Sequence, residues 1–296
     1  MAKTATVDAG QVVPTHIEPI SNRRRAWRRF WAYPLSKWGI LGLFFLVAFS
    51  FIGPMFYHAD PTQSHLLHTM MPPDTKFPLG TDALGRNELA RMMIGGQSSL
   101  EVGFSAAIVA MAFGTLYGMI SAMAGGIVDS LMMRIVDILL SIPSLFILLF
   151  LDAVFQPNIW LMIIIIASTS WLGVSRLVRA EVLSVKTQTY VEAALALGAS
   201  TWRTMAGYYL PNIMGTVLVA TTFAVADAIL TVAGLSFLGL GLPPPAPNWG
   251  AMLSSSMSYM FQNSWWLIYP PGAAILIAEL SINFLGDGLR HALSGR

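Results

Sequence analysis

Of the 296 residues, 55% are hydrophobic and only 11% are charged, whereas about 25% of residues are charged in a typical soluble domain. That balance excludes an ordinary soluble fold, and the absence of cysteine excludes disulfides, thiolate metal sites and cysteine nucleophiles. The net charge of +2 says little about partners, but its distribution is uneven, because arginines gather just before the first apolar run.

The N-terminal 37 residues divide into a polar tail and a basic, aromatic segment. Residues 1–22 show no hydrophobic periodicity and predict a flexible tail. Residues 23–37 suit nucleic-acid binding as one alternative, but the positive-inside rule and the aromatic belt explain them better. We therefore expect residues 1–37 to form a cytoplasmic tail with an interfacial segment, and we expect no nucleic-acid partner. The apolar run at 39–57 is too long for a signal peptide and lacks a small-x-small cleavage site, which indicates a retained helix.

Long apolar runs continue along the chain and predict an all-α integral membrane protein. The uncharged stretches 102–128, 153–175 and 204–226 are each long enough to cross a hydrocarbon layer ~30 Å thick, which takes about 20 residues. Because open sheet edges cannot face lipid, these runs predict one helical bundle, with residues 38–296 as the transmembrane domain. The six expected transmembrane helices lie at about 38–57, 100–124, 131–152, 158–178, 212–235 and 266–287.

An inside N-terminus then sets the topology of the loops. The 58–98 and 236–265 loops are expected outside, and the 179–211 loop and the C-terminus inside. The inside loop carries Arg179, Lys186 and Arg203, as the positive-inside rule requires. Arg86 and Arg91 in the first outer loop go against the rule, although acids accompany them.

No enzyme is expected, because the motifs of catalysis are missing. None of the four lysines follows a glycine, so the chain has no phosphate-binding loop for ATP. The H-E-x-x-H and G-x-S-x-G patterns are also absent. The outer loop does hold a small group of imidazole and carboxylate side chains, which suit Ni, Zn or Cu. We interpret them as loop residues without a ligand role and expect no metal site; they are His58, Asp60, His65 and His68.

The inside loop carries the most informative motif. Its sequence, YVEAALALG followed by YYLP, resembles the E-A-A-x₃-G-x₉-I-x-L-P signature of ABC-importer permeases. Tyr208 replaces the isoleucine of that signature. The resemblance implies that residues 187–211 form a cytoplasmic coupling helix that docks on an ATPase subunit. It also implies that ATP and Mg bind to the partner ATPases and that this chain holds no cofactor. The matching residues are Glu192, Ala193, Ala194, Gly198, Leu210 and Pro211.

Three further stretches resemble the dipeptide/oligopeptide/nickel permease family, and specifically the second of its two permeases. They are the outer-loop segment 77–86, the segment 235–250 and the C-terminal segment 283–290. The residues of the outer-loop motif are Gly80, Thr81, Asp82, Gly85 and Arg86. The chain departs from the family pattern at Asn87, Gln97 and Val232, where relatives often carry Asp, Arg and Glu.

The resemblance implies a heterodimer of permeases, two ATPase subunits and an extracytoplasmic binding protein, in a bacterial inner or plasma membrane. Alternating access driven by the ATPases is the implied mechanism. The implied cargo is peptides first, then nickel chelates, then other solutes such as oligosaccharides. The rival functions are an ion-driven secondary transporter or channel, and a membrane-embedded enzyme; neither would explain the coupling loop.

Two acids fall well inside the expected helices. Asp227 and Glu279 are expensive to bury in lipid, so such residues usually face a bundle interior or a watery path. Our hypothesis is that both face the translocation path, with interhelical hydrogen bonding as the alternative. The small residues Gly114, Gly118 and Ala122 predict close helix packing. Four aromatic residues suit the outer membrane interface, namely Trp249, Trp265, Trp266 and Tyr269.

Overall fold

The computed structural model describes residues 22–155 and 158–293. Within these ranges every regular element is a helix, and the only β pairing is an isolated bridge between Thr81 and Asn87. The polar tail expected at 1–22 lies outside the described residues apart from Asn22. The fold is therefore the all-helical one that the apolar runs predict.

Among the described residues, five helical segments are long and apolar enough to cross a membrane. Two of them contain short π turns, η1 (Ala48–Ile52) and η3 (Met205–Tyr209). The segments are α2–η1–α3 (Pro34–Val47, Ala48–Ile52, Gly53–Phe56), α4 (Glu88–Ala124), α7 (Ile159–Lys186), α9–η3–α10 (Thr201–Thr204, Met205–Tyr209, Leu210–Phe237) and α12 (Trp265–Leu293). A sixth span is present when the bent pair α5 (Gly126–Ser141) and α6 (Ser144–Phe155) is counted as one.

The third span is two helices rather than the single helix expected at 131–152. The axes of α5 and α6 differ by 81°. The break follows from Pro143, because the ring of a proline disfavours helical dihedrals at the preceding residue. Ile142 accordingly adopts an extended conformation, with φ −92° and ψ 125°.

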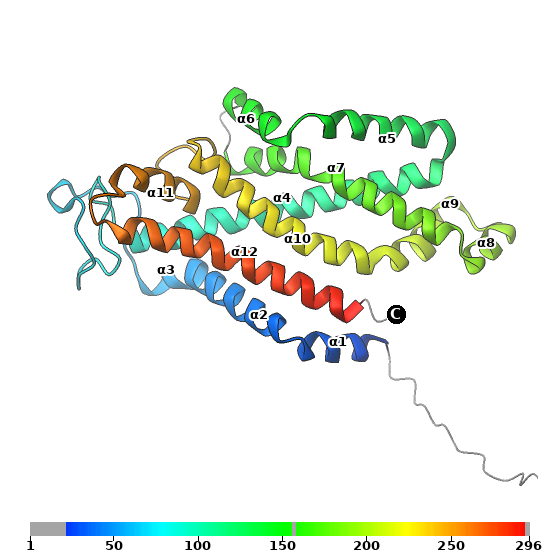
Figure 1. The fold of residues 1–296 in the computed structure, drawn as a ribbon, viewed down its shortest axis with the longest axis horizontal. Coiled ribbons are helices and arrows are strands. Elements are labelled where there is room, and N and C mark those ends of the chain that lie inside the picture. The colour runs from blue at the N-terminus through cyan, green and yellow to red at the C-terminus, as the bar shows by residue number, and fades with distance from the viewer. Residues whose placement is uncertain (1–21, 156–157, 294–296) are drawn as a thin grey trace, which may run out of the picture.

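The remaining elements lie at the two ends of the bundle (Figure 1). At one end are the loop that follows α3, with its turn η2 (Leu66–His68), and the pair α11 (Trp249–Ser256) and η4 (Met257–Tyr259). At the other end are α1 (Asn22–Ala32), α8 (Thr189–Ala196) and α9. Both α1 and α2 pack against α12, so segments far apart in sequence lie side by side.

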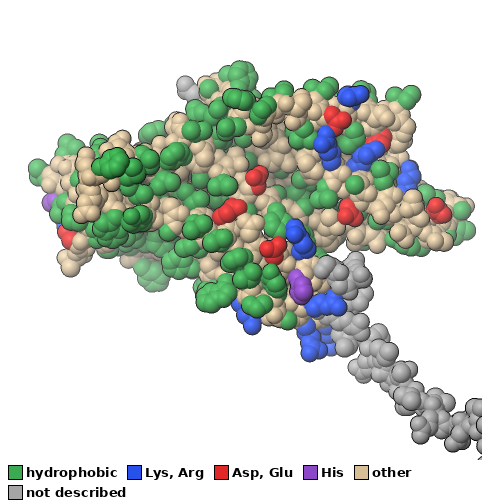
Figure 2. Space-filling view, viewed as in Figure 1, with side chains coloured by type: hydrophobic (Ala, Val, Ile, Leu, Met, Phe, Trp, Pro, Cys, Tyr) green, Lys and Arg blue, Asp and Glu red, His purple; other side chains and the backbone are tan. Residues whose placement is uncertain are grey.

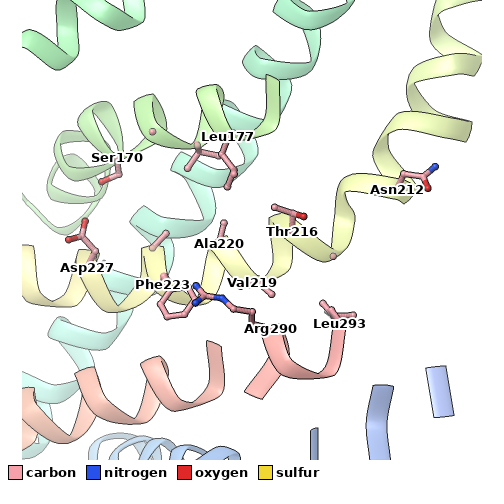
Figure 3. Close-up of a pocket in the computed structure, with 14 residues that line it drawn as sticks. Ser170, Leu177, Asn212, Thr216, Val219, Ala220, Phe223, Asp227, Arg290 and Leu293 are labelled. Atoms are coloured by element: carbon pink, nitrogen blue, oxygen red, sulfur yellow. The ribbon is translucent and has the colours of Figure 1, made fainter. Parts of the chain in front are cut away.

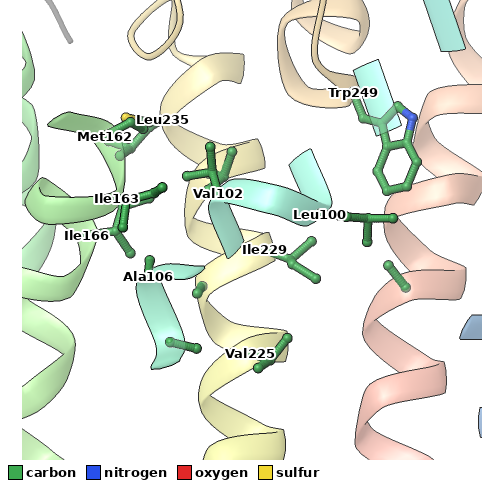
Figure 4. Close-up of a cluster of buried hydrophobic side chains, with 14 of the residues drawn as sticks. Leu100, Val102, Ala106, Met162, Ile163, Ile166, Val225, Ile229, Leu235 and Trp249 are labelled. Carbon is green, nitrogen blue, oxygen red and sulfur yellow. The ribbon is translucent and has the colours of Figure 1, made fainter. Parts of the chain in front are cut away.

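The core forms where α4 packs between α7 and α10. Leu100, Val102 and Ala106 of α4 belong to one apolar cluster with Ile163 and other buried side chains of α7 and α10, and Leu100 lies on the side toward α12 (Figure 4). In the most apolar stretch of α4, 56% of residues are buried, against 17% in the first span. The centre of the fold is therefore α4, whereas α2 lies at its edge.

Small residues bring α4 and α7 together, as the sequence predicts. A Cβ added at Gly114 would lie 2.8 Å from the Trp171 carbonyl oxygen, and one added at Gly118 would lie 2.4 Å from the Ser175 carbonyl oxygen. Ala122 is fully buried at the same contact. The two backbones approach so closely that a larger side chain does not fit between them.

The aromatic residues assigned to the membrane interface behave differently from one another. Trp265 and Tyr269 are exposed, as expected. Trp249 is completely buried, and its Nε1 donates to the Met92 carbonyl oxygen at 3.0 Å, so the interface assignment is wrong for this residue. Trp266 is also buried, and its Nε1 donates to the Thr81 carbonyl oxygen at 3.2 Å. These two indoles attach loop segments to the bundle instead of facing lipid headgroups.

Candidate coupling segment and transmembrane cavity

The connection between α7 and α10 contains the short helix α8. Val191 and Ala194, three residues apart on one face of α8, are buried. Glu192 and Ala193 are exposed on its other side. The buried face packs on a second apolar cluster, the inner cluster, which comprises Met111, Met119, Ala122, Val174, Val178, Val182, Val191, Tyr209 and Ile213. One side of α8 is thus held by the bundle, and the other side is free.

Gly198 ends α8 in a conformation that favours glycine. Its φ is +85°, and the two hydrogen bonds of a Schellman motif follow. The Gly198 amide donates to the Leu195 carbonyl at 3.0 Å, and the Ala199 amide donates to the Ala194 carbonyl at 3.0 Å. Ser200 then caps α9 by accepting from the Arg203 amide. The chain turns sharply here, which leaves Leu197 89% exposed and Trp202 71% exposed.

The rest of the motif leads back into the bundle. Pro211 is the second residue of α10 and directly follows the π turn η3, where the helical hydrogen-bond pattern is already altered. Leu210 packs against the inner cluster. Tyr208, which replaces the isoleucine of the signature, lies with its ring centroid 6.4 Å from that of Tyr190. The structure therefore brings both halves of the motif to one end of the bundle.

A cavity of about 860 Å³ opens between α7, α10 and the end of α12 (Figure 3). Asp227 lies at one end of it, and Asn212 lies toward the other. The Asp227 side chain is exposed, and no described residue forms an ion pair or hydrogen bond with its carboxylate. Arg290 also lines the cavity, and its guanidinium lies 4.7 Å from the centroid of the Phe223 ring.

Glu279 occupies a different environment on α12. It does not line the cavity, and its Oε1 accepts a hydrogen bond from Asn283 Nδ2 at 2.9 Å, one turn away. Its Oε2 is buried without a hydrogen-bond partner. The structure thus places Asp227 at the cavity and Glu279 within the packing of α12.

The outer-loop motif forms a compact turn before α4. Asp82 Oδ1 accepts from the amides of Leu84 and Arg86, and Asp82 Oδ2 accepts from Arg86 Nε at 2.7 Å. Gly80 and Gly85 have positive φ, and a Cβ at Gly85 would lie 2.0 Å from the His65 carbonyl oxygen. Thr81 Oγ1 donates to the His68 carbonyl. The motif therefore folds the loop upon itself.

Two buried charged residues beside this turn were missed by the sequence analysis as site residues. Glu88 and Arg91 are only 2% and 6% exposed, and Arg91 Nε lies 3.6 Å from Asp82 Oδ2 and 3.9 Å from Glu88 Oε2. Their three-residue spacing just before a long apolar run was the available signal. Asn87, where the family pattern has Asp, caps α4 by accepting from the Ala90 amide at 3.0 Å.

A second missed pair joins three helices near α8. Arg179 of α7 makes two hydrogen bonds to Asp129 of α5, both at 2.6 Å. Ser121 of α4 donates to Asp129 Oδ1 at 2.5 Å. This paired arrangement satisfies a carboxylate that is largely buried in the bundle.

The loop histidines do not assemble a metal site in the described part of the chain. No three His, Cys, Asp or Glu side chains there are placed to hold a metal ion. The rings of His65 and His68 lie 6.4 Å apart, and Asp60 accepts from the amide and hydroxyl of Thr62. The hydroxyl and amide bonds from Thr62 hold the pKa of Asp60 below its usual value.

Comparison with known proteins decides the family. Residues 114–296 match the family described as binding-protein-dependent transport system inner membrane component. The chain belongs to this family. Residues 21–73 also match the N-terminal transmembrane domain of oligopeptide transport permease C, which marks the second, C-type permease. As a permease subunit of an ABC importer, the protein is an integral inner-membrane component without catalytic activity of its own, and ATP binds to partner ATPases.

Individual permeases align along nearly the whole chain. Oligopeptide transport system permease protein OppC of Bacillus subtilis (strain 168) is 36% identical over 293 residues, covering 99% of this chain and 96% of the relative. Dipeptide transport system permease protein DppC of the same organism is 35% identical, with 93% and 86% covered. Di/tripeptide transport system permease protein DppC of Pseudomonas aeruginosa (strain UCBPP-PA14) is 36% identical, with 90% and 91% covered. Membership of a binding-protein-dependent system implies ATPase and binding-protein partners.

Proposed function

We propose that this permease moves di- or oligopeptides delivered by an extracytoplasmic binding protein, as one half of a permease heterodimer that works with two ATPase subunits. The relatives named for oligopeptides and dipeptides support the cargo. Residues 38–296 form the translocating domain, and residues 1–37 form the cytoplasmic tail and interfacial segment. Nickel chelates and oligosaccharides are the next candidates for cargo.

Both termini are cytoplasmic in this proposal. Lys and Arg side chains gather toward the end that carries α1 and α8, whereas the middle of the visible face shows hydrophobic and other uncharged surface with a few acids (Figure 2). The positive-inside rule assigns the basic end to the cytoplasm. That end is also the one that can reach cytoplasmic ATPases.

The observation that carries the proposal is the free surface of α8 and the turn that follows it. Its exposed Ala193, Leu197 and Trp202 form a slim, apolar projection with Glu192 beside them. Residues 187–211 insert this projection into a cleft of an ATPase. The opposite face of α8 lies on the inner cluster, which includes Val174. Val174 also lines the cavity, so a displacement of α8 has a direct packed route to the translocation path.

Replacing Ala193 with tryptophan is expected to remove most of the bound ATPase from the purified complex. The residue is exposed on α8, so the bulky side chain blocks docking without disturbing the permease core. Gly198 is a poorer target, because any other residue at φ +85° is strained. The measurement is the ratio of ATPase to permease after affinity purification through this chain, with the partner permease present.

Ala124→Trp is the matched control. Ala124 is an exposed alanine at the end of α4 and lies outside residues 187–211. It should retain the ATPases. Equal retention by Ala193→Trp would contradict the docking site. A wild-type complex that holds no ATPase would contradict the assignment of coupling to this surface altogether.

A further inference from the structure

The carboxylate of Asp227 is far from either end of α10 and has no partner in the described chain. Counting 1.5 Å per residue, it lies about 25 Å from the start of this helix and about 15 Å from its end. No described residue forms an ion pair or hydrogen bond with it, although the side chain is exposed in the cavity. A carboxylate at this depth is costly unless a positive group or water compensates it.

The cavity has the length that an extended peptide requires. From Asp227 to Asn212 it follows fifteen residues of α10, which corresponds to about 22 Å. An extended chain spans at most 3.3–3.6 Å per residue, so about six residues fit along it. The volume of about 860 Å³ lies within the usual range for ligand sites.

The lining of the cavity combines apolar surface with opposite charges. Leu177, Val219 and Phe223 supply apolar surface, and Thr216 supplies a hydroxyl. Arg290, over the Phe223 ring, is the positive group, and its Nη1 lies 3.8 Å from Oδ1 of Asp287 in an ion pair. Phe223 precedes Asp227 by one helical turn of α10, and Asp227, Phe223 and Arg290 all line the cavity (Figure 3). The cavity therefore offers one negative and one positive group to a zwitterionic ligand, which carries an ammonium and a carboxylate.

We propose that Asp227 binds the α-ammonium group of the peptide cargo within the permease. The inference rests on the proposed peptide function and assigns a ligand group to one residue of the path. An ammonium supplies three hydrogen-bond donors and a full positive charge. The Asp227 carboxylate has neither a donor nor a positive partner among the described residues. A single carboxylate is a poor site for a metal ion, and no metal-binding group includes it among the described residues. The amino end of the peptide then enters the deep end of the cavity.

The absence of cysteine allows a direct test. Thr216→Cys introduces the only thiol of this chain inside the cavity. The complex with its partner permease and ATPases is placed in nanodiscs without binding protein. A maleimide reagent is added, and labelling of this chain is followed by mass spectrometry. Trialanine and N-acetyl-trialanine are compared as protecting ligands.

Trialanine is expected to slow labelling at about tenfold lower concentration than its acetylated form, the order expected for one charge-assisted hydrogen bond. Adding Asp227→Asn should abolish the difference, and Asp227→Glu should preserve most of it. Glu101→Gln removes an exposed acid of α4 outside the cavity and should leave the difference intact. Equal protection by the two peptides in the Thr216→Cys parent, or an unchanged difference in Asp227→Asn, would overturn the proposal.

A second measurement distinguishes a failure of the ammonium site from a failure of the peptide function. It is the uptake of trialanine into liposomes by the same parent complex with its binding protein. If uptake occurs but neither peptide protects the thiol, the ammonium site is wrong and the peptide function stands. If uptake fails with every peptide, the peptide function is wrong and the ammonium site falls with it. Protection that is insensitive to acetylation but lost in Asp227→Asn would assign the acid to a cation of the partner permease instead.

Discussion

Replacing Gly118 with leucine is expected to eliminate nearly all folded protein. A Cβ at this position would lie 2.4 Å from the Ser175 carbonyl oxygen and 3.0 Å from the Val178 Cβ, and the remaining carbons of leucine would enter the α7 backbone. Overpacking by a few methylene groups already costs about 1–3 kcal/mol, and separating two backbones in the centre of the bundle costs more. The measurement is the yield of monodisperse protein in detergent, together with its thermal unfolding.

Gly234→Leu provides the matched control. Gly234 is inside α10 with ordinary helical φ, and an added Cβ there meets nothing within 4 Å. This variant should be purified in wild-type yield, because leucine is also a better helix former than glycine. If Gly118→Leu were equally stable, the close approach of α4 and α7 would be incorrect.

Replacing Arg179 with methionine is the second change with a large expected effect. Arg179 supplies both hydrogen bonds that pair the Asp129 carboxylate with a positive charge. Without it, Asp129 is a largely buried and uncompensated acid, and removing one partner of a buried pair costs about 3–5 kcal/mol. Because the Arg179 side chain is 32% exposed, we expect a loss near the lower limit, measured as a reduced unfolding temperature.

Two further variants isolate the cause of that loss. Asp129→Asn in the Arg179→Met background should restore part of the stability, because it removes the unpaired charge. Arg176→Met breaks the pair with Asp137, whose side chains are both about half exposed, and should cost less than about 1 kcal/mol. A double variant no more stable than Arg179→Met alone would show that Arg179 acts through packing.

Features governed by local spacing were predicted from the sequence. The apolar runs identified the spans, because length and hydropathy are properties of a short segment. The small residues Gly114, Gly118 and Ala122 recur every four residues and therefore share one helix face, whichever helix covers it. Gly198 is another local feature, because it both matches the signature and ends α8.

Features that depend on distant partners were not predicted. Trp249 was assigned to the interface on residue type, but Met92 and Ser99 of α4 offer hydrogen-bonding groups to its indole and amide more than 140 positions earlier in the chain. In the sequence, Asp227 and Glu279 lie at similar depths within their expected helices, so the two acids looked equivalent. Their surroundings differ because the helices packed around each helix set its rotation about its own axis. The position of a residue along its helix carries no information on that rotation.

The contact between α2 and α12 has a consequence for biogenesis. Gly39 and Gly42 fit against Ser281, so closely that a Cβ at Gly42 would lie 2.1 Å from the Ser281 hydroxyl oxygen. Translation delivers α2 to the membrane long before α12. The first span has a mean hydropathy of 2.1 and is therefore apolar enough to remain in lipid without a helical partner. The bundle therefore closes only after α12 has inserted, and until then Gly39 and Gly42 of α2 lack the helix that covers them.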